Sequence, residues 1–368
     1  MHIIFILLFV CRAFCTSAQC LTAFEDTRGA EWDYFYIYDN GNLIKQEHQK
    51  IQSFQVGANY VAYVDYQSSF KLYYQGTTYR LQEFAPESYY ATDTILVFVN
   101  TGDHVYVFDG RKVHYLGRKS NDIGLTRLAF GDNVVAFNDY LNSFIFFYNG
   151  VLSSFDNRTI SEFSANENIL TFLDPDYEFK YLYNGESGVI EQGTYVQSYK
   201  IHRNIIAYVD FVGDFKVFYK GVRQTLENLP PLSYETGEDM VAFVSDSDRR
   251  FKVFHENRIY KLMDTPPPFY KVQDNMLVYA DNFNHFYVFS RGKSEKLASY
   301  IPESYQIDRD IVVIKDLDNK LWGYIDGHYQ PISQGTVSYY KLDNKAVFYY
   351  NVPSSPKIFC NGETRIAY

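Results

Sequence analysis

Several patterns that would identify a protein class are missing from this sequence. Basic residues are in the minority, with 34 Lys and Arg against 44 Asp and Glu, so a protein that binds nucleic-acid phosphates is not expected. No stretch sustains the 3.6-residue apolar period of an amphipathic helix. Beyond the first twenty residues, no apolar run is long enough to cross a membrane, which takes roughly 20 residues as a helix.

Motifs of catalysis are also missing. The histidines share no metal-ligand spacing, and there is neither a Gly-x-Ser-x-Gly elbow nor a phosphate-binding glycine loop. Three of the expected loops contain Asp-x-Asp, at 174–176, 246–248 and 316–318, but none supplies the six to eight oxygen ligands that calcium takes. We therefore expect no metal site and no cofactor, with calcium as the one alternative, and no catalytic residue can be named.

Aromatic residues are unusually abundant. The chain has 36 Tyr and 31 Phe among 368 residues, and 46% of all residues are apolar. Such a composition can bury a core, which excludes a mostly disordered chain. Aromatic and β-branched residues favour strands over helices, so the composition predicts a β-rich fold.

The N-terminus has the features of a secretory signal. An apolar run, Ile3 to Val10, precedes the small residues Thr16-Ser17-Ala18, which form a typical cleavage site. We expect residues 1–18 to be removed and residues 19–368 to be secreted, periplasmic or attached to the cell surface, with no transmembrane segment. A lipid-anchored start at Cys20 is the alternative.

Two cysteines remain after such a cleavage, at opposite ends of the chain. They are Cys20 and Cys360, and an exported protein meets an oxidising compartment. We predict a disulfide between them. The alternative is two unrelated thiols.

One unit repeats along the whole chain. A turn glycine, replaced once by Asn257, recurs about every 35 residues, at Gly41, Gly76, Gly110, Gly150, Gly185, Gly221, Gly292, Gly327 and Gly362. Asn or Asp precedes six of these positions. Asn-Gly and Asp-Gly between apolar runs predict tight type I′ hairpins, which need positive φ at both central residues.

Each unit contains four short candidate strands. In the sixth unit they are 198–201, 205–210, 215–220 and 222–226. The second strand of each unit is apolar at nearly every position rather than alternating, which indicates that both of its faces are covered. Only nine first strands are readable, because the first unit begins at its second strand, Leu21 to Asp26.

The repeat resembles the blades of WD-repeat and TolB-type β-propellers, in rhythm rather than in any family signature. The resemblance covers Cys20 to Tyr368 and implies an all-β propeller of four-stranded antiparallel blades, about ten in number. Two smaller propellers are the alternative. The Trp-Asp dipeptide that names the WD repeat occurs once, at Trp32-Asp33, so the resemblance implies no particular function.

Acidic residues end most of the second strands and are the candidate ligand-binding groups. In a blade they would lie on loops of one face, several with an aromatic neighbour that suits a sugar or an extended peptide. The candidates are Asp65 with Tyr66, Asp139 with Tyr140, Asp176 with Tyr177, Asp210 with Phe211, and Phe283. The alternative is structural: such acids accept hydrogen bonds from their own loop, and the aromatic side chains pack between blades.

These observations favour an exported, non-enzymatic binding or scaffold propeller. Its expected partner is a protein or a glycan held on the loop face, and not a nucleic acid. The alternative function is a propeller-type polysaccharide hydrolase or lyase that uses carboxylates at the mouth of the central channel.

Overall fold

The computed structural model describes residues 20–26, 34–122, 124–155, 158–193, 195–351 and 356–366. Within these ranges the chain forms strands, turns and loops. None of the described residues belongs to a helix that could cross a membrane. The predicted signal segment, residues 1–18, lies outside the described residues.

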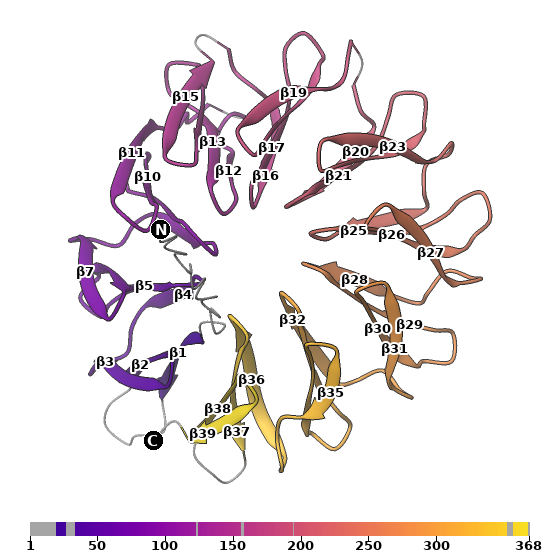
Figure 1. Ribbon diagram of the computed structural model, residues 1–368. Helices are drawn as coiled ribbons and strands as arrows, with labels where there is room; N and C mark the ends of the chain where they lie inside the picture. The colour runs from indigo at the N-terminus through magenta and orange to yellow at the C-terminus, as the bar shows by residue number, and fades with distance from the viewer. Residues whose placement is uncertain are drawn as a thin grey trace, which may run out of the picture.

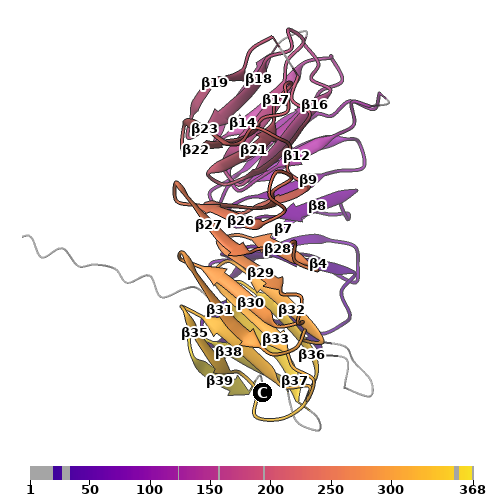
Figure 2. The ribbon, with the colours of Figure 1, turned by 90° about the vertical axis from the view of Figure 1, so that its right-hand side faces the viewer.

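The described strands form ten antiparallel sheets arranged as blades around one centre (Figure 1). Nine sheets have four strands in sequence order, and the first has three. Seen from the side, the blades together form one flattened ring (Figure 2). The prediction of an all-β propeller with ten units is confirmed, and the blades form one ring rather than two smaller ones.

From the centre outward we call the strands of a blade a, b, c and d. The a strands, absent from the described part of blade 1, are β4 (Ser53–Val56), β8 (Ser88–Ala91), β12 (Leu128–Phe130), β16 (Glu162–Asn166), β20 (Ser198–His202), β24 (Ser233–Thr236), β28 (Tyr270–Gln273), β32 (Ser304–Asp308) and β36 (Val337–Asp343). The b strands are β1 (Leu21–Asp26), β5 (Tyr60–Val64), β9 (Leu96–Val99), β13 (Val134–Asn138), β17 (Ile169–Leu173), β21 (Ile205–Val209), β25 (Met240–Val244), β29 (Met276–Ala280), β33 (Ile311–Lys315) and β37 (Ala346–Asn351).

The two outer strands complete each blade. The c strands are β2 (Tyr34–Asp39), β6 (Phe70–Tyr74), β10 (His104–Phe108), β14 (Phe144–Tyr148), β18 (Phe179–Tyr183), β22 (Phe215–Tyr219), β26 (Phe251–His255), β30 (Phe286–Ser290), β34 (Leu321–Ile325) and β38 (Pro356–Cys360). The d strands are β3 (Asn42–Glu47), β7 (Thr77–Gln82), β11 (Val113–Arg118), β15 (Val151–Phe155), β19 (Glu186–Glu191), β23 (Val222–Glu227), β27 (Arg258–Met263), β31 (Lys293–Ala298), β35 (His328–Pro331) and β39 (Glu363–Ile366).

The core lies between neighbouring blades, around the b and c strands. Every residue of β5, β13, β21, β25 and β29 is buried, because each b strand packs against a blade on either side. Phe215 of blade 6, for example, contacts Phe243 of blade 7 with ring centroids 5.3 Å apart. The unbroken apolar runs of the b strands follow from this two-sided burial.

The c–d hairpins follow the glycine repeat, with one exception. At Asn40-Gly41 the φ angles are 47° and 98°, and Asp39 pairs with Asn42 across a two-residue loop, as a type I′ turn requires. In blade 3 the prediction of such a turn is wrong. Phe108 pairs with Val113 across four residues, because the Asp109 carboxylate accepts bonds from the Arg111 and Lys112 amides at 2.9 and 3.0 Å and closes a wider loop.

A serine–tyrosine hydrogen bond links successive a strands. The tyrosine hydroxyl of one blade reaches the serine hydroxyl of the preceding blade, at 2.8 Å for Tyr89 with Ser53. The same bond recurs in Tyr234 with Ser198, Tyr270 with Ser233, and Tyr340 with Ser304. Part of the high tyrosine content is therefore explained by contacts between blades.

Longer polar side chains bridge the free edges of the a strands. The Gln55 side chain donates to the Tyr89 carbonyl at 2.8 Å and accepts from the Ala91 amide at 2.8 Å. Gln306 does the same for Tyr340 and Leu342 in blade 10. An unpaired strand edge is otherwise a site of aggregation, so these side chains replace the neighbouring strand that an a strand lacks.

Blade 1 closes the ring against blade 10, where the indigo and yellow ends of the chain lie side by side (Figure 1). Phe24 of β1 stacks on Phe348 of β37 at 4.2 Å. The buried Asn344 side chain donates to the carbonyl of Leu21 in blade 1 and to that of Gly57 in blade 2, at 3.2 and 2.6 Å. It thereby holds three blades together where blade 1 has no described a strand.

A disulfide joins Cys20 to Cys360 across the same junction, with Cα atoms 6.4 Å apart and a sequence separation of 340. Because a covalent link over so long a loop restricts the unfolded chain, we expect Cys20→Ser/Cys360→Ser to lower the free energy of unfolding by roughly 2–5 kcal/mol. Guanidinium unfolding of the two proteins measures the difference. Equal midpoints and slopes for the oxidised wild type and the variant would contradict this.

Candidate functional site

The ring has two chemically different faces. In an antiparallel blade successive connections alternate between the two ends of the strands. The b–c and d–a connections therefore share one face, which we call the loop face, and the a–b and c–d turns share the other, the turn face. All the ligand-binding residues predicted from the sequence belong to the loop face.

The acids that end the b strands bind their own loops. One carboxylate oxygen of Asp65 accepts from the Gln67 and Ser69 amides at 2.9 and 2.8 Å. The amides two and four residues on donate in the same way to one side-chain oxygen of Asn100, Asp139, Asp174, Asp281 and Asp316. Asp210 accepts instead from the amides three and four residues on, those of Gly213 and Asp214. The recurring acid is thus a loop-closing group, which is the structural alternative that the sequence left open.

In three blades the second oxygen of that acid contacts a lysine of the c strand. Lys71 lies 2.9 Å from Asp65 and Lys216 2.6 Å from Asp210, and Lys180 pairs with Asp174. Burial opposes ionisation of Asp210, but the bonds from Lys216 and the two loop amides are stronger, so the pKa of this carboxyl is lowered. Asp176, in contrast, is exposed and pairs only loosely, at 3.4 Å, with Arg158.

The aromatic candidates are all exposed on the loop face. Their exposed fractions lie between 48% and 79%. They come from the b–c loops of blades 2, 4, 5, 6 and 8, so they are spread over the loop face instead of forming one pocket: Tyr66, Tyr140, Tyr177, Phe211 and Phe283. Two of them nevertheless contact a neighbouring blade or connection: Tyr140 lies 6.0 Å from the Arg118 guanidinium of blade 3, and Phe211 contacts Tyr195, which follows blade 5, at 5.2 Å.

The same face carries further exposed apolar side chains that sequence analysis did not identify. Leu141 and Val212 follow two of the aromatic residues directly, and Leu317 lies in the b–c loop of blade 9. The d–a connections add Phe84, Tyr195, Leu229, Leu232 and Ile301. The signal for the first two was present in the sequence as aromatic–aliphatic pairs inside polar loops.

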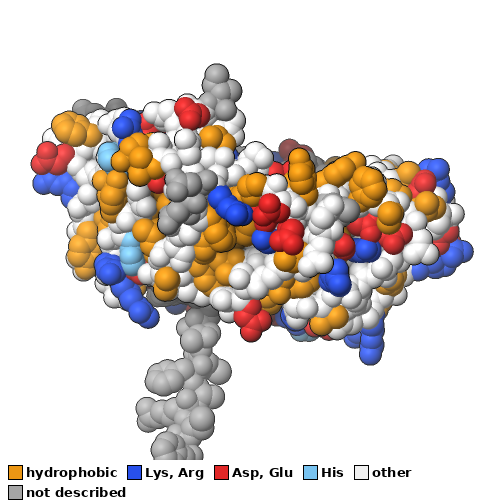
Figure 3. All heavy atoms as spheres, turned by 90° about the horizontal axis from the view of Figure 1, so that it is seen from above, with side chains coloured by type: hydrophobic (Ala, Val, Ile, Leu, Met, Phe, Trp, Pro, Cys, Tyr) orange, Lys and Arg blue, Asp and Glu red, His pale blue; other side chains and the backbone are white. Residues whose placement is uncertain are grey.

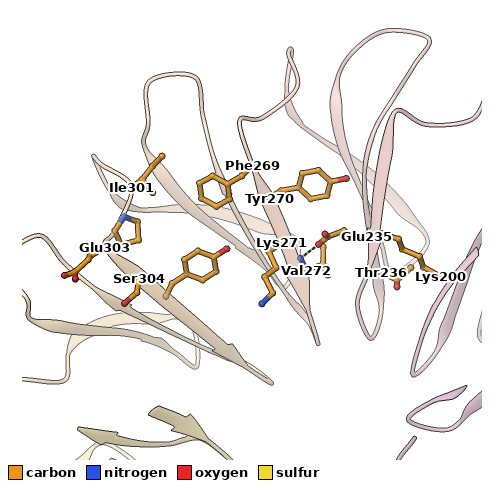
Figure 4. Close-up of a pocket in the computed structure, with 12 residues that line it drawn as sticks. Lys200, Glu235, Thr236, Phe269, Tyr270, Lys271, Val272, Ile301, Glu303 and Ser304 are labelled. Carbon is orange, nitrogen blue, oxygen red and sulfur yellow. Dashed lines mark hydrogen bonds between the residues drawn. The ribbon is translucent and has the colours of Figure 1, made fainter. Parts of the chain in front are cut away.

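A groove of about 870 Å³ opens between the a strands of blades 6 to 9 and their d–a connections (Figure 4). Phe269 and Tyr305 stack with ring centroids 6.2 Å apart on its wall. Lys200 and Glu235 lie on the inner strands, where Glu235 accepts from the Val272 amide at 2.9 Å. The groove therefore combines flat aromatic surface with both signs of charge, and it continues the loop face toward the centre of the ring.

Charged residues of the a–b turns meet at the turn face. We call this the turn-face network: Asp93, Asp132, Glu167, His202, Arg203, Glu238, Asp274 and Arg309. Arg203 of blade 6 binds Glu167 of blade 5 and Glu238 of blade 7, the latter at 2.7 Å. Arg309 of blade 9 reaches Asp93 of blade 3 at 2.8 Å, so the network links blades that are far apart in the ring order.

Burial perturbs the titration of this network. It raises the pKa of Glu167 to about 8, reinforced by the Asp132 and Glu238 carboxylates and opposed by Arg203. Burial likewise raises the pKa of Asp274 to about 6. It lowers the pKa of His202 to about 4, with a further contribution from the charge of Arg203.

Sequence analysis missed this network because no local motif encodes it. Each residue lies at the first or second position of its a–b turn, except His202, which ends β20, and these positions differ in chemistry from blade to blade. The rim, by comparison, shows hydrophobic side chains interspersed with charged ones of both signs (Figure 3).

Residues 15–365 match the model of one protein family, described as a 10-bladed beta propeller domain. No curated protein matches the sequence.

Three solved structures show a distant similarity to this chain. The computationally designed protein Ika8 is 15% identical over 84% of this chain and 96% of its own, with a TM-score of 0.35. Prp20p from Saccharomyces cerevisiae is 12% identical over 65% of this chain and 72% of its own, with a TM-score of 0.33. The ectodomain of the Arabidopsis thaliana receptor kinase ACR4 is 8% identical over 76% of this chain and 97% of its own, with a TM-score of 0.36. Likenesses this distant say nothing about function.

Asp210, which closes its loop, and Asp176, which is exposed, should differ in how much each contributes to the free energy of unfolding. Asp210→Ala leaves two loop amides without their acceptor and removes the closer of the two carboxylates that contact Lys216, so we expect it to lower the free energy of unfolding by about 1–3 kcal/mol. Asp176→Ala is the matched control and should change it by less than about 0.5 kcal/mol, because its side chain is exposed. Chemical unfolding measures both. Equal effects would contradict the loop-closing role.

Proposed function

The chain belongs to the family of 10-bladed beta propeller domains, and we propose that it is a non-enzymatic binding module that holds another polypeptide on its loop face. The observation that carries the proposal is the gathering of exposed apolar side chains on the b–c and d–a connections. Two of them, Tyr195 and Phe211, contact each other with ring centroids 5.2 Å apart, and exposed apolar side chains that cluster mark interaction sites. Loops held by a rigid scaffold are also where binding residues concentrate.

The chemistry of this face suits a protein partner. Its apolar side chains are interspersed with acids whose charge is already bound by the loop amides, so a partner does not have to compensate unpaired carboxylates. Exposed aromatic residues such as Phe211 and Phe283 offer large area at low entropic cost, as hot-spot residues do. The groove beside Phe269 and Tyr305 would admit an extended segment of the same partner.

The function as an enzyme on polysaccharides is favoured by one observation, the raised pKa of Glu167 near Asp132 in a cavity of about 590 Å³. A carboxyl that keeps its proton near neutral pH can serve as a general acid. Arg203, however, binds Glu167 directly and lies 3.6 Å from Asp132, so both acids already have a cationic partner. Incubating the protein with a panel of polysaccharides and measuring the products tests this function. Product release by the wild type that Glu167→Gln abolishes would show an enzyme and contradict the binding proposal.

A matched pair of variants tests the loop face. Phe211→Ser/Val212→Ser removes two exposed side chains from it, and Val222→Ser/Ile259→Ser removes two similarly exposed side chains from d strands on the rim. With envelope proteins and purified glycans as the panel, we expect the first variant to weaken binding to a protein at least tenfold and the second to leave it unchanged. Binding that survives the first variant, or that is restricted to glycans, would contradict a polypeptide site on this face.

We further propose that the protein works outside the cytoplasm. The sequence of residues 1–18 and the pairing of Cys20 with Cys360 support this, because disulfides persist in oxidising compartments. Expressed with its own N-terminus, the exported form is expected to begin at Gln19. A cytoplasmic product that keeps Met1 would contradict export.

A further inference from the structure

A groove of about 520 Å³ opens between blades 4 and 5, whose d strands β15 and β19 lie at the outer rim of the ring (Figure 1). It continues the apolar contact between these two blades outward, because Leu170 and Leu182 of that contact also line the groove. The rings of Phe146, Phe155 and Phe172 line it as well, and none of its described lining residues is charged.

The equivalent place between blades 7 and 8 is filled by an aromatic ring. Tyr260, the third residue of β27, packs against Phe289, the fourth residue of β30, with ring centroids 5.4 Å apart. Its hydroxyl lies over the c–d turn of blade 8, where a β-carbon on Gly292 would come within 3.0 Å of it. The third residue of the d strand thus reaches the turn of the next blade.

Two further junctions use the third residue of the d strand in the same way. Gln224 of β23 donates to the side chain of Asn257, in the c–d turn of blade 7, at 2.7 Å. The Arg365 guanidinium of β39 lies over Gly41, the turn glycine of blade 1. The contact therefore does not depend on a tyrosine, but it needs a side chain long enough to reach.

Blade 4 has no such side chain. Its third d-strand residue is Ser153, and the fourth c-strand residue of blade 5 is Leu182, so smaller residues stand at the positions of both Tyr260 and Phe289. Apart from its chain neighbours, no described atom lies within 4 Å of the place that a β-carbon on Gly185, the turn glycine of blade 5, would take. An apolar space is left where blades 7 and 8 hold an aromatic ring.

The chemistry of the groove selects a neutral aromatic ligand. A carboxylate or ammonium group would find no charged partner among the described lining residues, so its desolvation would be costly. Phe155 contacts Phe146 and Phe172 with ring centroids 5.4 and 5.6 Å apart, and such tilted rings offer faces and edges to one more ring. The hydroxyl groups of Ser153 and Ser187 can bond to a single polar group.

We propose that the groove between blades 4 and 5 binds a small, neutral molecule with one planar aromatic ring and one hydroxyl group, that is, a phenol. Its ring takes the place that Tyr260 holds in the junction of blades 7 and 8. The volume of the groove lies in the range of small-molecule sites, roughly 300–1,000 Å³. This site does not depend on the loop-face proposal, because the two share no residue.

Titration of the full chain with p-cresol, the tyrosine side chain as a free molecule, tests the ligand class. We expect saturable binding of one p-cresol per chain and a rise in the unfolding temperature. 4-Methylbenzoate has a similar size but carries a charge, and we expect it to bind weaker by about tenfold or more.

Ser153→Tyr tests the place of binding, because it supplies the ring that blade 7 already has. We expect this variant to lose p-cresol binding and to unfold at a higher temperature, since filling a groove stabilises a fold. Leu152→Tyr is the matched control. It adds the same ring one residue away, on the opposite face of β15, and should bind p-cresol like the wild type.

No saturable binding of p-cresol by the wild type, or binding that Ser153→Tyr leaves unchanged, would overturn the proposal. So would a protein partner that Ser153→Tyr displaces from a chain that does not bind p-cresol, because the groove would then hold a polypeptide. If Ser153→Tyr fails to fold, a crystal of the wild type soaked with 4-bromophenol decides. Bromine density between Ser153 and Leu182 is expected, and bromine bound only elsewhere would refute the site.

Discussion

The free edge of each inner strand is the constraint on which this structure depends. Four-stranded blades arranged in a ring leave every a strand with one unpaired edge facing the centre, and unpaired backbone groups are costly or invite aggregation. The protein satisfies these groups with side chains of the neighbouring blade. Gln55 and Gln306 each make two such bonds, and serine–tyrosine pairs add a second link between the same strands.

This solution determines where function can reside. The a strands make the contacts between blades. The recurring acids at the ends of the b strands close their loops, as Asp65 and Asp210 show. What remains free to vary is the sequence of the b–c and d–a connections and of the a–b turns. The exposed apolar side chains of the loop face and the charges of the turn face both lie at such positions.

The sequence predicts the fold well because the fold repeats. The turn glycines and the apolar b strands are local patterns, and so is the start of the repeat at a b strand, which agrees with the three strands described for blade 1. The site was harder to predict. Local patterns predicted both possible roles of Asp139, ligand binding and loop closing. They could not predict that Glu167, His202 and Asp274 lie close together, because these residues come from three blades that the circular arrangement brings together. The turn at Asp109-Gly110 was mispredicted because a side-chain contact with the Arg111 and Lys112 amides outweighs the dipeptide preference.

Ten blades form one closed ring, and ion pairs cross its turn face. A density map of the isolated protein at side-chain resolution would test this arrangement. We expect ten blades in a single ring, with β1 beside β37 and Arg203 and Arg309 spanning the turn face. Two separate lobes, an open arc, or arginines turned out to solvent would contradict it.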